Sequence, residues 1–92
     1  MSSITLSENI GTLTPSEAIV LQQVHEDGED DPRTLARMLG MSRQHVLNII
    51  AHLKHKGLIA IDGGYDGLWV HLTNKGRRLI SYLWPESRSV FA

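Results

Sequence analysis

The chain has 92 residues and a mass of 10.3 kDa, which is the size of one small domain. It contains no cysteine, which excludes disulfides, thiolate zinc sites and cysteine nucleophiles. Its longest apolar runs, at 18–21 and 58–61, have four residues, far fewer than the roughly 20 that span a membrane, and no secretory signal is visible. The sequence therefore predicts a soluble, cytoplasmic domain with no membrane partner.

Charge is distributed unevenly along the chain, although the net charge is only −1. Residues 1–31 carry seven acids and no Lys or Arg, whereas residues 32–92 carry nine Lys or Arg and three acids. The segment 32–57 holds five basic residues and no acid. A segregated basic segment permits a local polyanion site, while the near-neutral total argues against indiscriminate polyanion binding. A chance cluster of solvated surface charges would give the same pattern. The position of the basic residues in the fold must therefore decide between a polyanion site and ordinary surface.

The N-terminal third predicts an arm followed by a helix. Residues 1–13 suit a short strand or an N-terminal arm. A helix is predicted to begin after Thr14, because Thr14 is a good N-cap, Pro15 suits the first helical position and Glu17 completes a capping box. The acidic stretch 26–31 that follows is interpreted as a solvated loop.

Two further helices follow at close spacing. Asp31 and Pro32 form a second N-cap and first-turn proline, and Gly40 ends that helix. Ser42 caps a third helix, predicted over 42–56, for which Gly57 is the left-handed terminator. Because so few residues separate the two helices, they must cross sharply, which is the geometry of a helix-turn-helix.

After Gly57 the apolar period changes from helical to alternating. Residues 58–61 predict a strand, 62–67 a glycine-rich turn and 68–72 a second strand. On that second strand Leu68 is expected to face inward, together with the other apolar residues of even number. Trp69 is expected on the outward face, where it marks an interface or packs across the hairpin.

The last element is a helix capped by Thr73, and residues 85–92 are expected to form a C-terminal tail. The domain is thus predicted over 14–84. Its fold class is α+β, mostly α: a three-helix core, a two-stranded hairpin and a C-terminal helix.

The outer face of the helix 42–56 carries the functional prediction. With Val46 at the centre of the buried face and 100° per residue, amide and imidazole side chains lie opposite. Such groups hydrogen-bond base edges in a major groove, and a first-turn arginine reaches a guanine or a phosphate. The expected base readers are Arg43, Gln44, His45 and Asn48. The expected phosphate contacts are Arg33, Arg37, Ser42 and Lys54.

Three blocks carry a resemblance to a known family: LARMLGMSRQHV (35–46), LKHKGLI (53–59) and VHLTNKG (70–76). Together they resemble the winged helix-turn-helix of MarR-type transcriptional regulators over about residues 13–84. The resemblance implies sequence-selective binding of double-stranded DNA by a homodimer. It also implies that the helix 42–56 lies in the major groove and that the turn 62–67 is the wing.

The chain departs from that family in its wing and its termini. MarR-type wings usually present Arg or Lys to the minor groove, whereas this one offers Asp62, Tyr65 and Asp66. A phosphate would repel the acids, so the Tyr65 hydroxyl is the best phosphate contact that the wing could make. Full-length members also have long terminal helices that dimerise and frame an effector pocket. Few residues flank the helices here, so no small-molecule effector is expected, and a homodimer would use the arm, the first helix or the last helix.

Other chemistry is not indicated. His45, His52 and His55 have no thiolate or carboxylate near them in the sequence, so no metal is expected. There is no nucleophile elbow and no phosphate loop, so the chain is predicted not to be an enzyme and to need no cofactor. One alternative function stays open, a winged-helix protein–protein interaction module without direct DNA readout. The acidic wing, Leu47 and Trp69 favour this alternative.

Overall fold

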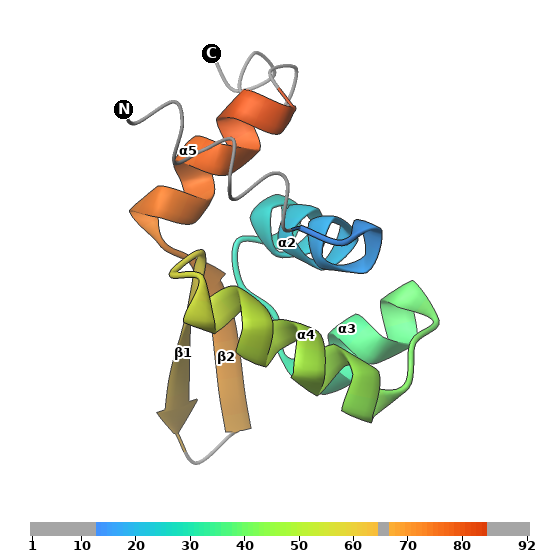
Figure 1. The fold of residues 1–92 in the computed structure, drawn as a ribbon. Coiled ribbons are helices and arrows are strands. Elements are labelled where there is room, and N and C mark those ends of the chain that lie inside the picture. Colours follow the sequence, from blue (N-terminus) through green and yellow to red (C-terminus); the bar gives the residue numbers. More distant parts are fainter. Residues whose placement is uncertain (1–12, 65–66, 85–92) are drawn as a thin grey trace.

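The computed structural model describes residues 13–64 and 67–84. Their elements, in chain order, are α2 (Pro15–Asp27), α3 (Pro32–Leu39), α4 (Arg43–His55), β1 (Ile59–Gly64), β2 (Gly67–Leu72) and α5 (Asn74–Leu83) (Figure 1). The predicted class, mostly helical with one two-stranded antiparallel hairpin, is confirmed. The predicted tail and all of the predicted arm except Leu13 lie outside the described residues.

Each helix has the N-cap that the sequence predicts, although α4, predicted over 42–56, runs from Arg43 to His55. At Thr14 both halves of the capping box form, because the Glu17 N–H donates to Thr14 Oγ1 (3.1 Å) and the Thr14 N–H donates to Glu17 Oε1 (3.0 Å). Asp31, Ser42 and Thr73 cap α3, α4 and α5, each accepting a backbone N–H in the first turn. These caps satisfy backbone N–H groups that would otherwise lack a partner, and they fix where each helix starts.

The turn between α3 and α4 depends on Gly40. This residue adopts φ +66° and ψ +32°, the left-handed conformation that favours glycine. The Met41 N–H then donates to the Ala36 carbonyl at 3.0 Å, which closes the end of α3. Ser42 begins α4 immediately afterwards, so the predicted helix-turn-helix is present.

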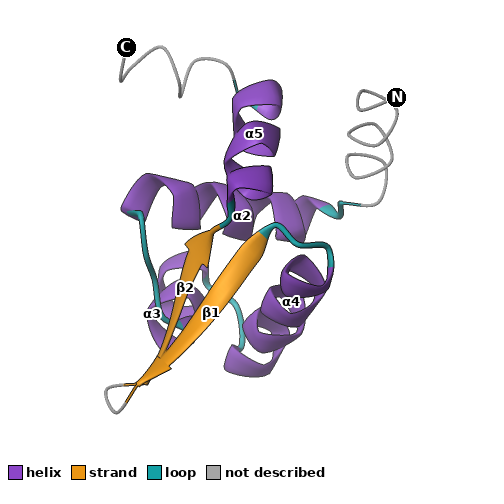
Figure 2. Cartoon of the chain, turned by 90° about the vertical axis from the view of Figure 1, so that its left-hand side faces the viewer, coloured by secondary structure: helices purple, strands orange, loops and turns teal. Residues whose placement is uncertain are grey.

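A single core lies between the helices and the hairpin. Figure 2 shows α2 crossing behind the strands, α3 and α4 on either side of them, and α5 at the end of the molecule opposite the hairpin tip. The fully buried large side chains come from every element or its flanks: Val20, Leu21, Val24, Leu35, Val46, Leu53, Leu58, Val70, Leu79 and Ile80. Within the described ranges, no helix is both long and apolar enough to cross a membrane.

The hairpin is longer than predicted. Pairing runs from Ile59 with Leu72 to Gly64 with Gly67, so most of the predicted turn 62–67 belongs to the strands. The prediction was wrong because the glycines on both strands pair through their backbones, which composition alone does not indicate. Leu68, expected to be buried, is 46% exposed because it lies toward the hairpin tip, away from the core, and Trp69 is half-buried.

The acidic stretch 26–31 is not a uniformly solvated loop. Asp30 is only 5% exposed, and its backbone forms a β-bridge with Val70 of β2. The Asp30 N–H donates to the Val70 carbonyl (3.0 Å), and the Val70 N–H donates to the Asp30 carbonyl (2.7 Å). This pairing draws the side chain of Asp30 into the protein, so the loop prediction was wrong at this residue.

Candidate nucleic-acid interface

The outer face of α4 has the composition that the helical arithmetic predicts. Arg43, Gln44, His45, Asn48 and Lys54 are all exposed. The buried positions of α4 are Val46, Ile49, Ile50 and Leu53. The apolar side therefore packs on the core, and the exposed side presents amides, imidazoles and cations without an acid.

Two amides on this face are already aligned. Gln44 Nε2 donates to Asn48 Oδ1 at 3.0 Å, one helical turn away. The bond uses a donor of Gln44 and the acceptor of Asn48. The Gln44 oxygen and the Asn48 amino group take no part in this bond, so an acceptor and a donor remain available for base edges.

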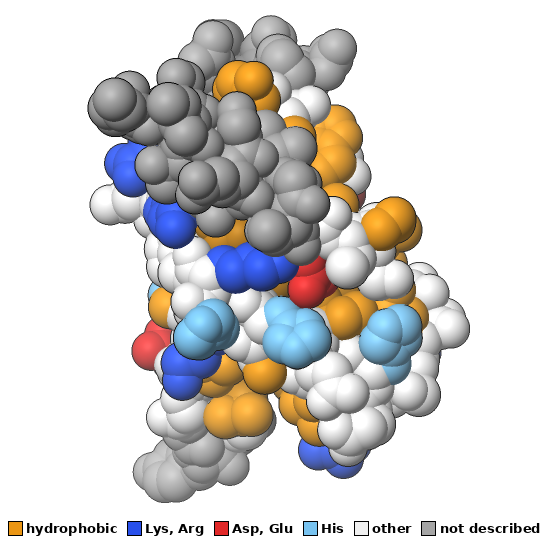
Figure 3. Space-filling view, in the orientation of Figure 1, with side chains coloured by type: hydrophobic (Ala, Val, Ile, Leu, Met, Phe, Trp, Pro, Cys, Tyr) orange, Lys and Arg blue, Asp and Glu red, His pale blue; other side chains and the backbone are white. Residues whose placement is uncertain are grey.

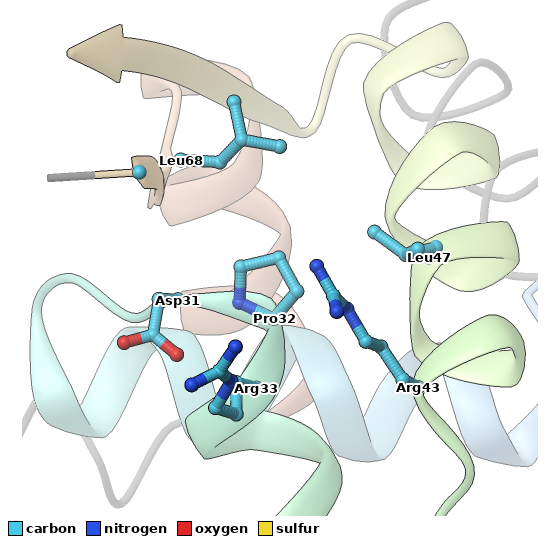
Figure 4. Close-up of a pocket in the computed structure, with 7 residues that line it drawn as sticks. Asp31, Pro32, Arg33, Arg43, Leu47 and Leu68 are labelled. Carbon is cyan, nitrogen blue, oxygen red and sulfur yellow. The ribbon is translucent and has the colours of Figure 1, made fainter. Parts of the chain in front are cut away.

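A groove of about 340 Å³ lies between α4, the start of α3 and β2. In Figure 4 the side chains of Arg33 and Arg43 approach it from two different helices, beside Pro32, Leu47 and Leu68. Two guanidinium groups can bind a phosphate, and the apolar side chains can contact a sugar or a thymine methyl group. Sequence reasoning missed Leu68 because it places that side chain in the core.

The acidic side chain at this groove, Asp31, already has partners within α3. It accepts hydrogen bonds from the Thr34 N–H (2.6 Å) and the Thr34 hydroxyl (3.1 Å). The pKa of Asp31 is lowered, chiefly by the backbone hydrogen bond from Thr34 and further by Arg33 and Arg37, which together outweigh the effect of burial. Asp31 is therefore an ionised helix cap, and both arginines stay exposed beside it.

A second groove, of about 360 Å³, lies between α4 and the start of α2. Its lining includes Glu17, His45, Asn48 and His52. Figure 3 shows histidine side chains in a row across this face, with acidic and basic side chains beside them. The Glu17 side chain is 5% exposed and contacts Lys56 Nζ (2.8 Å) and His52 Nδ1 (3.4 Å).

Two opposing effects act on the pKa of Glu17. Burial raises the pKa, but hydrogen bonds from Lys56 and from the Thr14 N–H, together with the charges of Lys56 and His52, lower it more. The net pKa is below the ordinary value, so Glu17 is ionised. The sequence indicates the capping box but not these pairs, because Lys56 lies 39 positions away.

The remaining predicted residues do not all reach these grooves. Arg37 is exposed on α3, and Tyr65 lies outside the described residues. On the hairpin, Asp62 Oδ2 lies 3.5 Å from His71 Nδ1. In the part of the chain that the structure describes, no three His, Asp or Glu side chains gather in a way that could hold a metal ion.

One family model matches this chain, and solved structures share its fold. The family model described as "MarR family" matches residues 12–67. A probable transcriptional regulator from Pseudomonas aeruginosa is 26% identical, with a TM-score of 0.74 over 86% of this chain and 61% of its own. No curated protein matches significantly.

Two further solved structures share the fold. Bordetella bronchiseptica BpsR, whose DNA binding is regulated by 6-hydroxynicotinic acid, is 23% identical, with a TM-score of 0.73 over 86% of this chain and 58% of its own. A mutant of Escherichia coli MarR, solved in complex with operator DNA, is 20% identical, with a TM-score of 0.73 over 84% of this chain and 56% of its own. The present chain thus spans about three fifths of the length of these proteins.

Proposed function

Since this chain belongs to the MarR family, we propose that it is a transcriptional regulator that recognises specific double-stranded DNA through the outer face of α4. The observation that carries the proposal is the exposed, acid-free row formed by Arg43, Gln44 and Asn48, on a helix whose other side is buried. An exposed helix of this composition fits a major groove. The proposed activity is binding and regulation, not catalysis.

The contacts divide into base readout and phosphate binding. Arg43, Gln44, His45 and Asn48 read bases from α4. Phosphates are held by Arg33 and Arg37 of α3, by the α4 N-terminus at Ser42, and by Lys54. Leu47 and Leu68, in the groove beside α4, contact a sugar or a thymine methyl group. The described residues of the hairpin include no Lys or Arg, and the exposed Asp62 on β1 repels phosphate, so the hairpin makes no electrostatic contribution to affinity through them.

We also propose that the regulator binds an inverted repeat as a homodimer. The Escherichia coli protein that shares this fold was solved in complex with operator DNA, which supports duplex DNA as the ligand of the fold. Two large apolar side chains on other helices than α4 are exposed, Ile19 on α2 (48%) and Tyr82 on α5 (60%), and they are available for a subunit contact. In such a dimer the two α4 helices would lie one DNA turn apart, ~34 Å.

Selection of bound sequences from a random duplex pool tests the proposal. We expect a palindromic consensus whose half-sites are separated by about one helical turn. A library without enrichment would contradict sequence-specific recognition and favour the protein-interaction alternative. A consensus without internal symmetry would retain DNA recognition and contradict the two-fold dimer.

A further inference from the structure

His52 lies beside a buried carboxylate, and most of its side chain is exposed. Its Nδ1 lies 3.4 Å from Glu17 Oε2, while the side chain is 67% exposed. The Glu17 carboxylate is almost completely buried, so it acts as an anchor that belongs to α2. His52 lines the same groove as His45 and Asn48, two of the proposed base readers.

The carboxylate determines how the imidazole is used. A histidine whose Nδ1–H points at a carboxylate has a defined ring orientation, with Nε2 on the opposite edge. In the neutral ring Nε2 is an acceptor, which a phosphate oxygen repels. In the imidazolium both nitrogens donate, so the same ring can bridge a buried carboxylate and an external phosphate.

We propose that His52 is a phosphate-binding residue that takes up one proton when the protein binds DNA. Its Nδ1–H donates to Glu17, and its Nε2–H donates to a phosphate oxygen of the strand that borders α4 on its α2 side. The proton comes from solvent. This inference rests on the proposed DNA-binding function and adds to it a residue and a pH dependence.

The charged groups around His52 determine how its protonation changes the net charge beside the groove. From α2 it faces the ionised Glu17, which is paired with Lys56 at 2.8 Å. From α4 it neighbours His45 along the groove. From α5, Lys75 Nζ donates to the Lys56 carbonyl at 2.9 Å, which holds the end of α4 in place. Glu17 and Lys56 carry opposite charges. Protonation of His52 therefore gives the group of three side chains a net positive charge beside the groove.

His52 differs in this respect from the other histidines of α4. Over the described residues, the carboxylate–histidine pairs are Glu17 with His52 and Asp62 with His71, and the second lies on the hairpin. His55 is exposed on the same helix without such a pair in the described structure. His55 is therefore the matched control for His52.

The test is the affinity for the selected duplex at pH 6 and pH 8, at constant ionic strength, measured by fluorescence anisotropy. The wild type should bind at least about fivefold more tightly at pH 6, since uptake of one proton changes affinity by up to about tenfold per pH unit. The binding constant should also fall more steeply with salt at pH 6 than at pH 8. The slope of log K against log salt concentration should be steeper by about 0.9, because one more phosphate is neutralised.

Substitutions show which histidine causes the pH dependence of DNA affinity. His52→Gln should bind at both pH values as the wild type binds at pH 8, and His55→Gln should keep the wild-type pH dependence. A pH dependence that survives in His52→Gln, or that vanishes in His55→Gln, overturns the inference. If the wild type binds the duplex equally well at both pH values, only this inference fails; if it binds no duplex selectively, the proposed function fails as well.

Discussion

The two buried acids of the described structure lie at the start of α2 and just beyond its end, and their surroundings are opposite. Glu17, in the first turn, is 4% exposed and contacts Lys56, His52 and the Thr14 N–H. Asp30, just beyond the last turn, is 5% exposed, and its Oδ2 has no hydrogen-bond partner among the described residues. Its charged neighbours are Asp27 and Asp31.

This contrast shows that partners, and not burial alone, decide the state of a carboxyl group. Burial raises the pKa of both groups. At Glu17 the hydrogen bonds and the cation reverse the effect, and the net pKa is lowered. At Asp30 burial, a hydrogen bond with Asp27 and the charges of Asp27 and Asp31 all act in one direction and raise the pKa to about 7. The start of α2 is therefore held against α4 by paired charges, whereas Asp30, which follows the other end and pairs with β2, keeps its proton in mildly acidic solution.

The largest expected effect is at Asp30. Between the ordinary pKa of 3.8 and about 7, folded Asp30 keeps a proton that the unfolded chain has released. Raising the pH through this range therefore favours unfolding, by about 4 kcal/mol at most. Asp30→Asn should match the wild type near pH 4 and exceed its stability at pH 7.5, as measured by urea unfolding followed by circular dichroism.

The control for that prediction is Glu26→Gln, which removes an exposed acid from α2. It should leave the pH dependence of unfolding unchanged. If Asp30→Asn and the wild type lose stability in parallel between pH 4 and 7.5, Asp30 is not the group responsible.

At Glu17 the expected change is smaller and has the opposite pH dependence. Glu17→Gln removes the charge that faces Lys56 and His52 and should lower the free energy of unfolding by about 2 kcal/mol at pH 7. Because the pKa of Glu17 is lowered, its contribution is present above the ordinary value of 4.5 and is lost as the pH falls through the folded value. The same urea titrations at pH 7 and pH 3 measure this change.

Glu26→Gln is the matched variant, because Glu26 is exposed on the same helix. It should change stability by less than about 0.5 kcal/mol. Equal effects of the two substitutions would show that the Glu17 pairs contribute no more than an exposed charge does.

The smallest effect is expected at Asp27, which changes the pKa of its neighbour Asp30. The hydrogen bond and the charge of Asp27 both raise the pKa of Asp30. Asp27→Asn removes that charge, so the folded pKa of Asp30 should fall and the pH-dependent loss of stability should end at a lower pH. Urea titrations at half-unit steps between pH 5 and pH 8 measure this shift. An end point that moves to higher pH would contradict the assigned cause.

The sequence predicts the features of the fold that depend on neighbouring residues. Thr14, Asp31 and Ser42 each cap a helix through an N–H three positions away, so local pattern is sufficient to find them. The outer face of α4 follows from helical periodicity in the same way. Periodicity alone thus identifies most of the candidate site.

Features that depend on distant residues were missed. The β-bridge between Asp30 and Val70 joins the segment that follows α2 to β2. No pattern in the neighbouring sequence indicates this pairing. The pairs of Glu17 with His52 and Lys56 depend equally on how α2 lies against α4. Both buried acids were therefore assigned only their local roles, as part of a cap and as part of a loop.

The most direct test of the central claim compares one pair of variants on two duplexes. Gln44→Ala and Asn48→Ala should each weaken binding to the selected duplex by ~1–3 kcal/mol and leave binding to a scrambled duplex nearly unchanged, with Asn74→Ala on α5 as the exposed-amide control. Equal losses on both duplexes, or no loss on either, would contradict the claim that the outer face of α4 reads the DNA sequence.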